Sequence, residues 1–461
     1  METDTEEGQY EGAYTRPNLP GPWPAEGETP SLPEVYRTIP VPKGGPMLRR
    51  LLAFVGPGYL VAVGYMDPGN WATDIAGGAK YNYVLLSVVL ISSLMAVFLQ
   101  ALSAKLGIVT GRDLAQACRD AYSKPASICL WLSAEIAIVA CDIAEVIGAA
   151  IALNLLFGLP LVAGVILTAA DVLLVLALQS KGFRWIETFV ITLIGTMMVI
   201  FTLEIFYSKP DWHGVLVGFA PSSKIVTDPS MLYIALGILG ATVMPHNLYL
   251  HSSIVQTRRF GKSIPELKEA IKLAYTDSTV ALTLAFFVNA AILIVAAAVF
   301  FRAGKTGIDN IQDAYKLLTP LVGISVATPL FAIALLASGQ NSTLTGTLAG
   351  QIVLEGFLHV QIRPWLRRMI SRLIALVPAV FAVAIYGSTG LARLMLFSQV
   401  VLSAQLSFAV VPLIQFTSDR TKMGEFANGA FTKILGWGLA VVIALLNVYL
   451  IVTTLAPQST K

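Results

Sequence analysis

Long apolar stretches recur along almost the whole chain and constrain the fold more than any other feature. A helix of about 18 apolar residues can cross the roughly 30 Å hydrocarbon core of a bilayer, and eleven stretches reach that length. They cover residues 48–75, 82–106, 128–155, 160–179, 185–207, 230–257, 273–302, 326–353, 369–387, 391–416 and 434–456. Hydrophobic residues make up 56% of the 461 residues and charged residues only 13%. The sequence therefore predicts an all-α protein that crosses the membrane many times.

The charged residues and the cysteines exclude several other classes of protein. A formal net charge of +3 over this length forms no basic stripe for nucleic acid. The three cysteines, Cys118, Cys129 and Cys141, have neither disulfide nor zinc-site spacing. We interpret them as ordinary small apolar residues, and we expect neither a resident cofactor nor an obligate protein partner.

The distribution of positive charge predicts the orientation in the membrane. Residues 1–45 are rich in Pro, Gly and Glu and lack an apolar core, which indicates a disordered tail outside the membrane. Of the 31 Lys and Arg residues, 23 fall on the side of this tail and 8 on the other. Because positive loops stay in the cytoplasm, we expect a cytoplasmic N-terminus, a transmembrane domain over 46–457 and an external tail over 458–461.

Two of the predicted spans contain residues that break a helix. The first span contains MDPGN at 66–70, and the sixth contains GATVMPHN at 240–247. In each, a proline removes a backbone donor and clashes with the preceding turn, so both helices should unwind there. Irregular backbone at membrane depth survives only where it lines a cavity or is packed in protein. The two breaks therefore mark a binding site.

The spacing of the breaks indicates an internal repeat. Five predicted helices separate the first break from the second, as expected when the second half of a transporter repeats the first in inverted orientation. The repeats would be helices 1–5, about 48–207, and helices 6–10, about 230–416, followed by helix 11 at 434–456. Such folds place substrate and coupling ions between the broken helices, near the middle of the membrane.

Residues at the two breaks offer a mixed set of metal donors. Asp67 offers a carboxylate, Asn70 an amide oxygen and Met244 a thioether. Unwound backbone near Gly64 and Ala241 offers carbonyl oxygens. Oxygen donors alone would suit Mg²⁺ or Ca²⁺, whereas a soft sulfur favours transition metals. The set predicts a transition-metal site between the breaks.

The same motifs closely resemble those of a known family. DPGN in the first predicted helix and MPH in the sixth match the signature motifs of the Nramp family, the natural resistance-associated macrophage protein transporters, also called MntH-type transporters. The resemblance covers about residues 45–457. It implies a LeuT-like fold and proton-coupled uptake of Mn²⁺ and Fe²⁺ by alternating access, across the cell membrane of a bacterium.

The resemblance also implies which residues hold the ion. Four principal ligands would be the side chains of Asp67, Asn70 and Met244 and the carbonyl of Ala241. Two accessory ligands would be the carbonyl of Gly64 and the side chain of Gln399, which lies in FSQV of the tenth predicted helix and completes the shell when the site is closed.

Three acids of the third predicted helix, AEIAIVACDIAEVIG, indicate a route for protons. Glu135, Asp142 and Glu145 are spaced to share one helical face, and ionisable residues inside a membrane usually mark an ion path or a proton relay. The alternative is that they form structural hydrogen bonds or pair with a cation such as Arg372.

Two residues at the breaks are candidates for the same proton route. His246 lies two residues after Met244 and corresponds to a family histidine that is associated with proton movement. A structural histidine is the alternative reading of this residue. Asp67 could also take up a proton that enters with the metal.

Other ionisable residues lie in or beside the predicted spans. Asp171 lies near the middle of the fourth span, and we assign it no role. Asp277 and Glu187 lie near cytoplasmic ends, where we expect solvated pairing with nearby Arg or Lys. His251 is interpreted as structural.

Three other functions remain open at this point. A LeuT-fold carrier of a small organic solute would bind a substrate carboxylate on Gly-rich unwound backbone. An intramembrane metal-dependent enzyme would need an open metal site and a general base, but the sequence has no HExxH or GxSxG motif. A channel would need a continuous pore, which paired broken helices do not favour.

Overall fold

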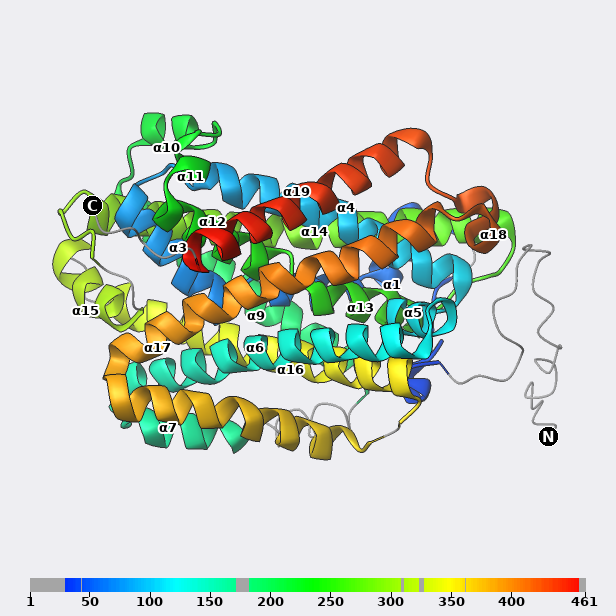
Figure 1. Ribbon diagram of the computed structural model, residues 1–461, viewed down its shortest axis with the longest axis horizontal. Helices are drawn as coiled ribbons and strands as arrows, with labels where there is room; N and C mark the ends of the chain where they lie inside the picture. The colour runs from blue at the N-terminus through cyan, green and yellow to red at the C-terminus, as the bar shows by residue number, and fades with distance from the viewer. Residues whose placement is uncertain are drawn as a thin grey trace, which may run out of the picture.

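A computed structural model describes residues 30–42, 44–170, 182–307, 311–322, 327–360 and 362–455. In this part of the chain nearly every residue is helical, and most long helices lie side by side along the long axis of the molecule (Figure 1). The long helices are α4 (Leu86–Thr110), α6 (Lys124–Phe157), α9 (Phe183–Ser208), α14 (Ile264–Ala296), α16 (Ala327–Leu358), α17 (Pro364–Ser418) and α19 (Ala430–Leu455). α6 packs against α16 and α17, and α14 packs against α4.

Shorter helices complete the bundle and its ends. The first predicted span is divided into α1 (Met47–Phe54), α2 (Pro57–Gly64) and α3 (Pro68–Tyr81), and the sixth into α12 (Pro229–Thr242) and α13 (Pro245–Ile254). The remaining α-helices are α5 (Leu114–Ala121), α7 (Leu161–Leu167), α10 (Trp212–Gly218), α11 (Lys224–Thr227), α15 (Ile311–Val322) and α18 (Arg420–Met423). The short 3₁₀-helices are η1 (Pro33–Val35), η2 (Thr168–Ala170), η3 (Val255–Thr257) and η5 (Gly424–Phe426). The element η4 (Ala297–Phe301) is a π-helical turn.

The described helices that are long and apolar enough to cross a membrane are fewer than the eleven expected spans. Among the described residues, seven helical stretches are long and apolar enough to cross a membrane, or eight if the bent pair α1 and α2 forms one span. α16 does not qualify because its middle is polar, and the side chains there, including Ser338, Asn341 and Thr343, are buried inside the bundle. α17 contains the two helices expected at 369–387 and 391–416, which are separated at Gly387, whose φ of 61° and ψ of −146° are not helical. Of the two, Gly390–Ser418 is long and apolar enough to cross a membrane. Residues 171–179 of the fourth span lie outside the described residues.

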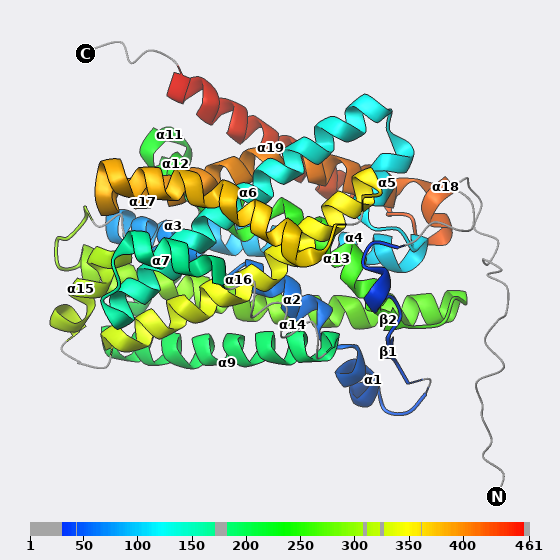
Figure 2. The ribbon, with the colours of Figure 1, turned by 90° about the horizontal axis from the view of Figure 1, so that it is seen from below.

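The two ends of the bundle carry different small elements. At one end, which we call the strand end, the strands β1 (Ile39–Pro40) and β2 (Arg258–Arg259) pair in parallel near α1, α5 and α18 (Figures 1 and 2). At the opposite end lie α10, α15 and the last turn of α19. The described chain thus begins and finishes at opposite ends of the bundle.

The last part of the predicted tail, 1–45, is packed onto the strand end. Residues 1–29 lie outside the described residues, but Leu32 and Ile39 are buried. The backbone N–H of Leu32 donates to Glu355 Oε2 of α16 at 3.1 Å, and Ile39 pairs with Arg258. Residues 30–41 therefore tie α16 to the segment that follows α13.

Candidate metal centre

The first helix breaks between α2 and α3. α2 ends at Gly64, and the N–H groups of Tyr65 and Met66 close only short turns back to Ala62 and Val63. α3 begins at Pro68, which needs no N–H partner in the first turn. Asp67 is the N-cap of α3, and its Oδ1 accepts a hydrogen bond from the backbone N–H of Asn70 at 2.8 Å. The cap fixes the Asp67 carboxylate at the break.

The second break has the same local structure as the first, with a proline at the start of the following helix. α12 ends at Thr242, Val243 leaves the helical conformation with φ −104° and ψ 68°, and α13 begins at Pro245. Met244 is the N-cap of α13 and is fully buried. Each sequence motif therefore produces the interruption expected from its proline.

Close approaches at two glycines bring the two breaks and α17 together. A Cβ on Gly64 would lie 2.2 Å from Asn247 Nδ2, so the end of α2 touches the first turn of α13. A Cβ on Gly69 would lie 2.1 Å from Gln399 Nε2, so α17 presses its amide against the first turn of α3. Neither position has room for a side chain.

All six predicted metal ligands are buried at this junction. Asn70 Oδ1 and Gln399 Oε1 have no hydrogen-bond partner among the described residues. Gly64 and Ala241 lie in the last turns of α2 and α12, where backbone carbonyls have no partner within their own helix and carry partial negative charge. Buried acceptors that lack donors are costly unless something binds them. This donor set fits a cation.

The donors are chemically mixed. Within the described part of the chain, no three His, Cys, Asp or Glu side chains gather in a way that would hold a metal ion. A cation here would instead bind one carboxylate, Asp67, and neutral oxygen and sulfur donors. Met244 belongs to a small buried cluster that also contains Cys141, and Cys141 Sγ lies 4.0 Å from Asp67 Oδ2.

Two of the three predicted acids of α6 lie beside this centre. Asp142 and Glu145 are fully buried. Glu145 is close enough to Asp67 to interact with its charge, and Thr343 of α16 donates a hydrogen bond to Glu145 Oε2 at 3.4 Å. Asp142 interacts electrostatically with His246, which is buried in the first turn of α13.

Glu135 lies apart from this group, toward the beginning of α6. It is partly exposed and forms an ion pair with Arg367, whose Nη2 lies 2.7 Å from Oε1 and 2.9 Å from Oε2. Trp131 Nε1 also donates to Glu135 at 3.2 Å. The cation that pairs with Glu135 is therefore Arg367, whereas the sequence suggested Arg372, whose side chain is not described.

Comparison with known proteins identifies the family. Residues 58–453 match the protein family described as Natural resistance-associated macrophage protein-like. The chain belongs to the Nramp family. It is 59% identical over 433 residues to the divalent metal cation transporter MntH of Listeria monocytogenes, a match that covers 94% of this chain and 97% of that protein.

Solved structures confirm the predicted fold. A manganese transporter of Eremococcus coleocola, crystallised with an aromatic bis-isothiourea compound, has 42% sequence identity and a TM-score of 0.86 and covers 94% of this chain and 93% of its own. The inward-facing form of Mhp1 has 15% identity and a TM-score of 0.55 and covers 96% of this chain and 93% of its own. At that identity the second match shows the fold alone. This Nramp protein thus has the LeuT-like, all-α fold expected from its motifs.

Sequence reasoning missed the side chains that hold the first break open. Asn289 of α14 donates to the Tyr65 carbonyl at 2.8 Å, and Ser338 of α16 donates to the Met66 carbonyl at 2.6 Å. Both bonds satisfy backbone groups that the break removes from the helix. The available signal was a lone polar residue within an apolar stretch for Asn289 and the start of a polar run, SGQNST, for Ser338.

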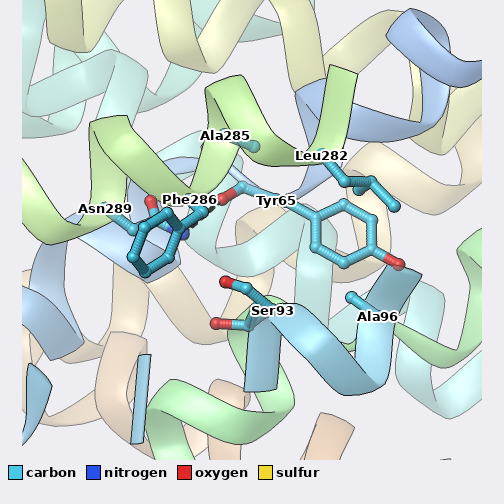
Figure 3. Close-up of a pocket in the computed structure, with 8 residues that line it drawn as sticks. Tyr65, Ser93, Ala96, Leu282, Ala285, Phe286 and Asn289 are labelled. Carbon is cyan, nitrogen blue, oxygen red and sulfur yellow. Dashed lines mark hydrogen bonds between the residues drawn. The ribbon is translucent and has the colours of Figure 1, made fainter. Parts of the chain in front are cut away.

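A narrow crevice adjoins the first break on the side of α14. Figure 3 shows Tyr65 and Asn289 joined by their hydrogen bond in this crevice, with Ser93 of α4 nearby. Its lining residues are Tyr65, Ser93, Ala96, Thr242, Leu282, Ala285, Phe286 and Asn289. The lining includes no charged side chain, so the crevice supports the break and offers no second ion site.

Two acids that we expected to be solvated are buried at the strand end. Asp277 accepts hydrogen bonds from the backbone N–H groups of Gly56, at 3.3 Å, and Gly58, at 2.7 Å, and so caps α2. Glu187 forms an ion pair with Arg258 at 2.7 Å, and both side chains are almost fully buried. The expected pairing with arginine is confirmed for Glu187, but the expected solvation was wrong for both acids, since both side chains are buried. Asp171 lies outside the described residues.

The buried histidine His251 takes part in a polar chain, in agreement with a structural role. Its Nδ1 lies 3.0 Å from Gln100 Oε1, and Gln100 Nε2 donates to the Tyr65 hydroxyl at 2.7 Å. The chain links α13 to the residue that follows α2. His251 therefore connects the two broken helices on the strand-end side.

Proposed function

We propose that this Nramp protein takes up divalent transition-metal ions, Mn²⁺ and Fe²⁺, across the cell membrane together with protons. One observation carries the proposal: a single buried carboxylate, Asp67, stands among unpartnered oxygen donors and a thioether where two helices break. The names of the relatives agree, since they are a divalent metal cation transporter and a manganese transporter. Those relatives are transporters, and the proposal assigns no catalytic step.

The chemistry of the site favours such an ion. Asp67 would supply negative charge, Asn70 and the carbonyls of Gly64 and Ala241 neutral oxygen, and Met244 soft sulfur. Gln399 would complete the shell from α17. The ends of α2 and α12 that face the site carry the negative poles of their helix dipoles, which offset part of the remaining positive charge.

Alternating access would expose this site to each side in turn. In the structure all six proposed ligands are buried. On the strand-end side, Arg258 and Asp277 hold the region around α2, and on the other side Gln399 lies against Gly69. Movement of α2 with α13 would open one path, and movement of α17 away from α3 the other.

The proposed route for protons starts at Asp67. A proton that enters with the metal would bind Asp67 or pass through His246 to Asp142 and Glu145, since these groups interact electrostatically. Glu135, with Arg367, would form the far end of this path along α6. The positive-charge bias supports a cytoplasmic position for the strand end.

Proteoliposomes that record Mn²⁺ uptake and internal pH together test the function. We expect saturable Mn²⁺ uptake accompanied by acidification of the lumen. Uptake without a pH change would contradict proton coupling, and the absence of metal-dependent uptake would contradict the function as a whole. A panel of amino acids and nucleobases, tested as competitors, should leave Mn²⁺ uptake unchanged, and inhibition by one of them would favour an organic solute carrier.

Replacing Met244 by alanine should weaken discrimination against Ca²⁺. The substitution removes the only donor in the proposed set that a hard cation does not prefer. We expect the ratio of Mn²⁺ to Ca²⁺ uptake to fall roughly tenfold, which corresponds to about 1.4 kcal/mol. Competition between the two ions in proteoliposomes measures this ratio. An unchanged ratio would remove sulfur from the selectivity argument, and Met395→Ala, a buried methionine of α17, is the matched control.

Replacing Glu145 by glutamine should separate proton entry from metal entry. Glutamine keeps the size of the side chain and an acceptor for Thr343 but cannot carry a proton. We expect proton influx to fall by about tenfold more than Mn²⁺ influx. The two fluxes are measured in one vesicle preparation. An equal loss of both would argue against a relay that is separate from the metal site.

A further inference from the structure

The surroundings of Cys141 in the structure indicate a role other than that of an ordinary small apolar residue. It is buried, as an ordinary small apolar residue would be. Its sulfur, however, lies 4.0 Å from Asp67 Oδ2 and 3.7 Å from Glu145 Oε1. It also shares a packed cluster with Met244. This thiol therefore lies close to the proposed metal carboxylate and in the same buried cluster as the proposed thioether ligand.

We propose that Cys141 is a second sulfur donor of the ion site and biases this transporter toward thiophilic cations such as Cd²⁺ and Zn²⁺. The inference rests on the proposed function and names a further residue that sets the selectivity of the same ion site. Within the described residues, Cys129 is exposed and Cys118 lies in α5, so Cys141 is the cysteine placed at the centre.

The geometry allows one ion to contact both groups. Metal–thiolate and metal–carboxylate bonds of Zn²⁺ are about 2.3 Å and 2.1 Å long, so two such donors of one ion can be at most roughly 4.4 Å apart. The observed separation between Cys141 Sγ and Asp67 Oδ2 is 4.0 Å. A cation could lie between them without movement of either side chain.

The donors that surround this position support a ligand. Asn70 Oδ1 and Gln399 Oε1 are buried and have no hydrogen-bond partner among the described residues. Asn70 follows Asp67 by three residues, and Gln399 lies against Gly69 in the same turn. The site thus has open oxygen acceptors in addition to the thiol.

Binding of a metal ion by the thiol changes its protonation state and not its oxidation state. A thiol that binds a metal ion loses its proton, and Glu145 Oε1, 3.7 Å from the sulfur, is in place to accept it. No oxidation takes place, and the bond that forms is between sulfur and metal. The added negative charge and the softness of the thiolate both favour Cd²⁺ and Zn²⁺ over Mn²⁺.

Serine and alanine at position 141 separate this role from simple positioning of Asp67. Cys141→Ser keeps a hydrogen-bond donor but replaces sulfur by oxygen, whereas Cys141→Ala removes the donor as well. In proteoliposomes given Cd²⁺ and Mn²⁺ together, we expect the ratio of Cd²⁺ to Mn²⁺ uptake to fall roughly tenfold in both variants. The matched control, Cys129→Ser, should keep the wild-type ratio.

Two results would overturn the inference. If Cys141→Ser retains the wild-type ratio and only Cys141→Ala loses uptake of both ions equally, Cys141 is a positioning residue. X-ray absorption at the cadmium edge of the full wild-type protein gives a second test that needs no variant. We expect two sulfur neighbours, from Met244 and Cys141, and a single sulfur would contradict the proposal. Wild-type protein that takes up neither ion would instead contradict the proposed function itself.

Discussion

Replacing Asp67 by alanine is expected to abolish Mn²⁺ uptake, a fall of roughly 100-fold or more. Asp67 is the one carboxylate in the proposed donor set, and it is fully buried at the first helix break. Without its charge, a divalent cation would have to leave water for a site of neutral donors, which is costly in a medium of low dielectric. Mn²⁺ uptake by proteoliposomes that contain equal amounts of folded protein measures the effect.

The asparagine variant at the same position separates binding from folding. Asp67 Oδ1 caps α3 by accepting a hydrogen bond from the Asn70 N–H, and loss of an N-cap costs about 0.5–2 kcal/mol. Asp67→Asn keeps a cap acceptor and removes only the charge. We expect it to retain near-wild-type thermal stability and to lose uptake as fully as alanine. Substantial uptake by either variant would place the ion elsewhere.

Replacing Arg258 by alanine is expected to lower the free energy of unfolding by about 3–5 kcal/mol, the usual cost of breaking a buried ion pair. The Arg258 side chain is fully buried, 2.7 Å from Glu187, and it donates to the carbonyls of Phe54 at 2.8 Å and Val55 at 2.7 Å. Its removal leaves the Glu187 carboxylate inside the protein without this partner. Thermal unfolding in detergent, followed by circular dichroism, measures the change.

Two variants test whether this loss comes from the ion pair. Arg259→Ala changes the next residue, which is exposed, and should alter stability by less than about 0.5 kcal/mol. In Arg258→Ala the buried Glu187 carboxylate keeps only Arg184, 3.1 Å away and 43% exposed, as an ion-pair partner. The double variant Arg258→Ala with Glu187→Ala removes both charges and should recover a large part of the stability, because the cost lies in the poorly compensated buried charge. A double variant less stable than Arg258→Ala alone would contradict this account.

The two helix breaks could be predicted because proline acts locally. Pro68 and Pro245 each begin a new helix in the structure, as their missing N–H group requires. The residues before them, Asp67 and Met244, therefore stand at the breaks whatever the rest of the chain does. This part of the site and the LeuT-like fold followed from short motifs.

The number of spans could not be predicted in the same way. Hydropathy alone does not distinguish a helix that faces lipid from one that faces other helices. α16 is surrounded by α6, α9 and α13, so it can bury polar residues such as Asn341 in its middle. Its residues cover the span expected at 326–353, although the helix is less apolar than the stretches that qualify by length and composition.

Residues that complete the site from distant elements were also beyond prediction. Cys141, Asn289 and Ser338 come from three different helices, and each looks like a minor polar interruption in its own stretch. Their partners, Asp67, Tyr65 and Met66, are known only once the helices are packed. The burial of Glu187 and Asp277 likewise depends on partners that are remote in the sequence, Arg258 for Glu187 and the backbone of Gly56 and Gly58 for Asp277.

Burial of the centre inside the bundle limits how fast the protein can work. Each ion must wait for one path to close and the other to open, and rearrangements of this size take microseconds to milliseconds. The flux through one molecule therefore has a turnover ceiling and cannot grow in proportion to the external concentration. Cells that need more metal would have to make more copies of the protein.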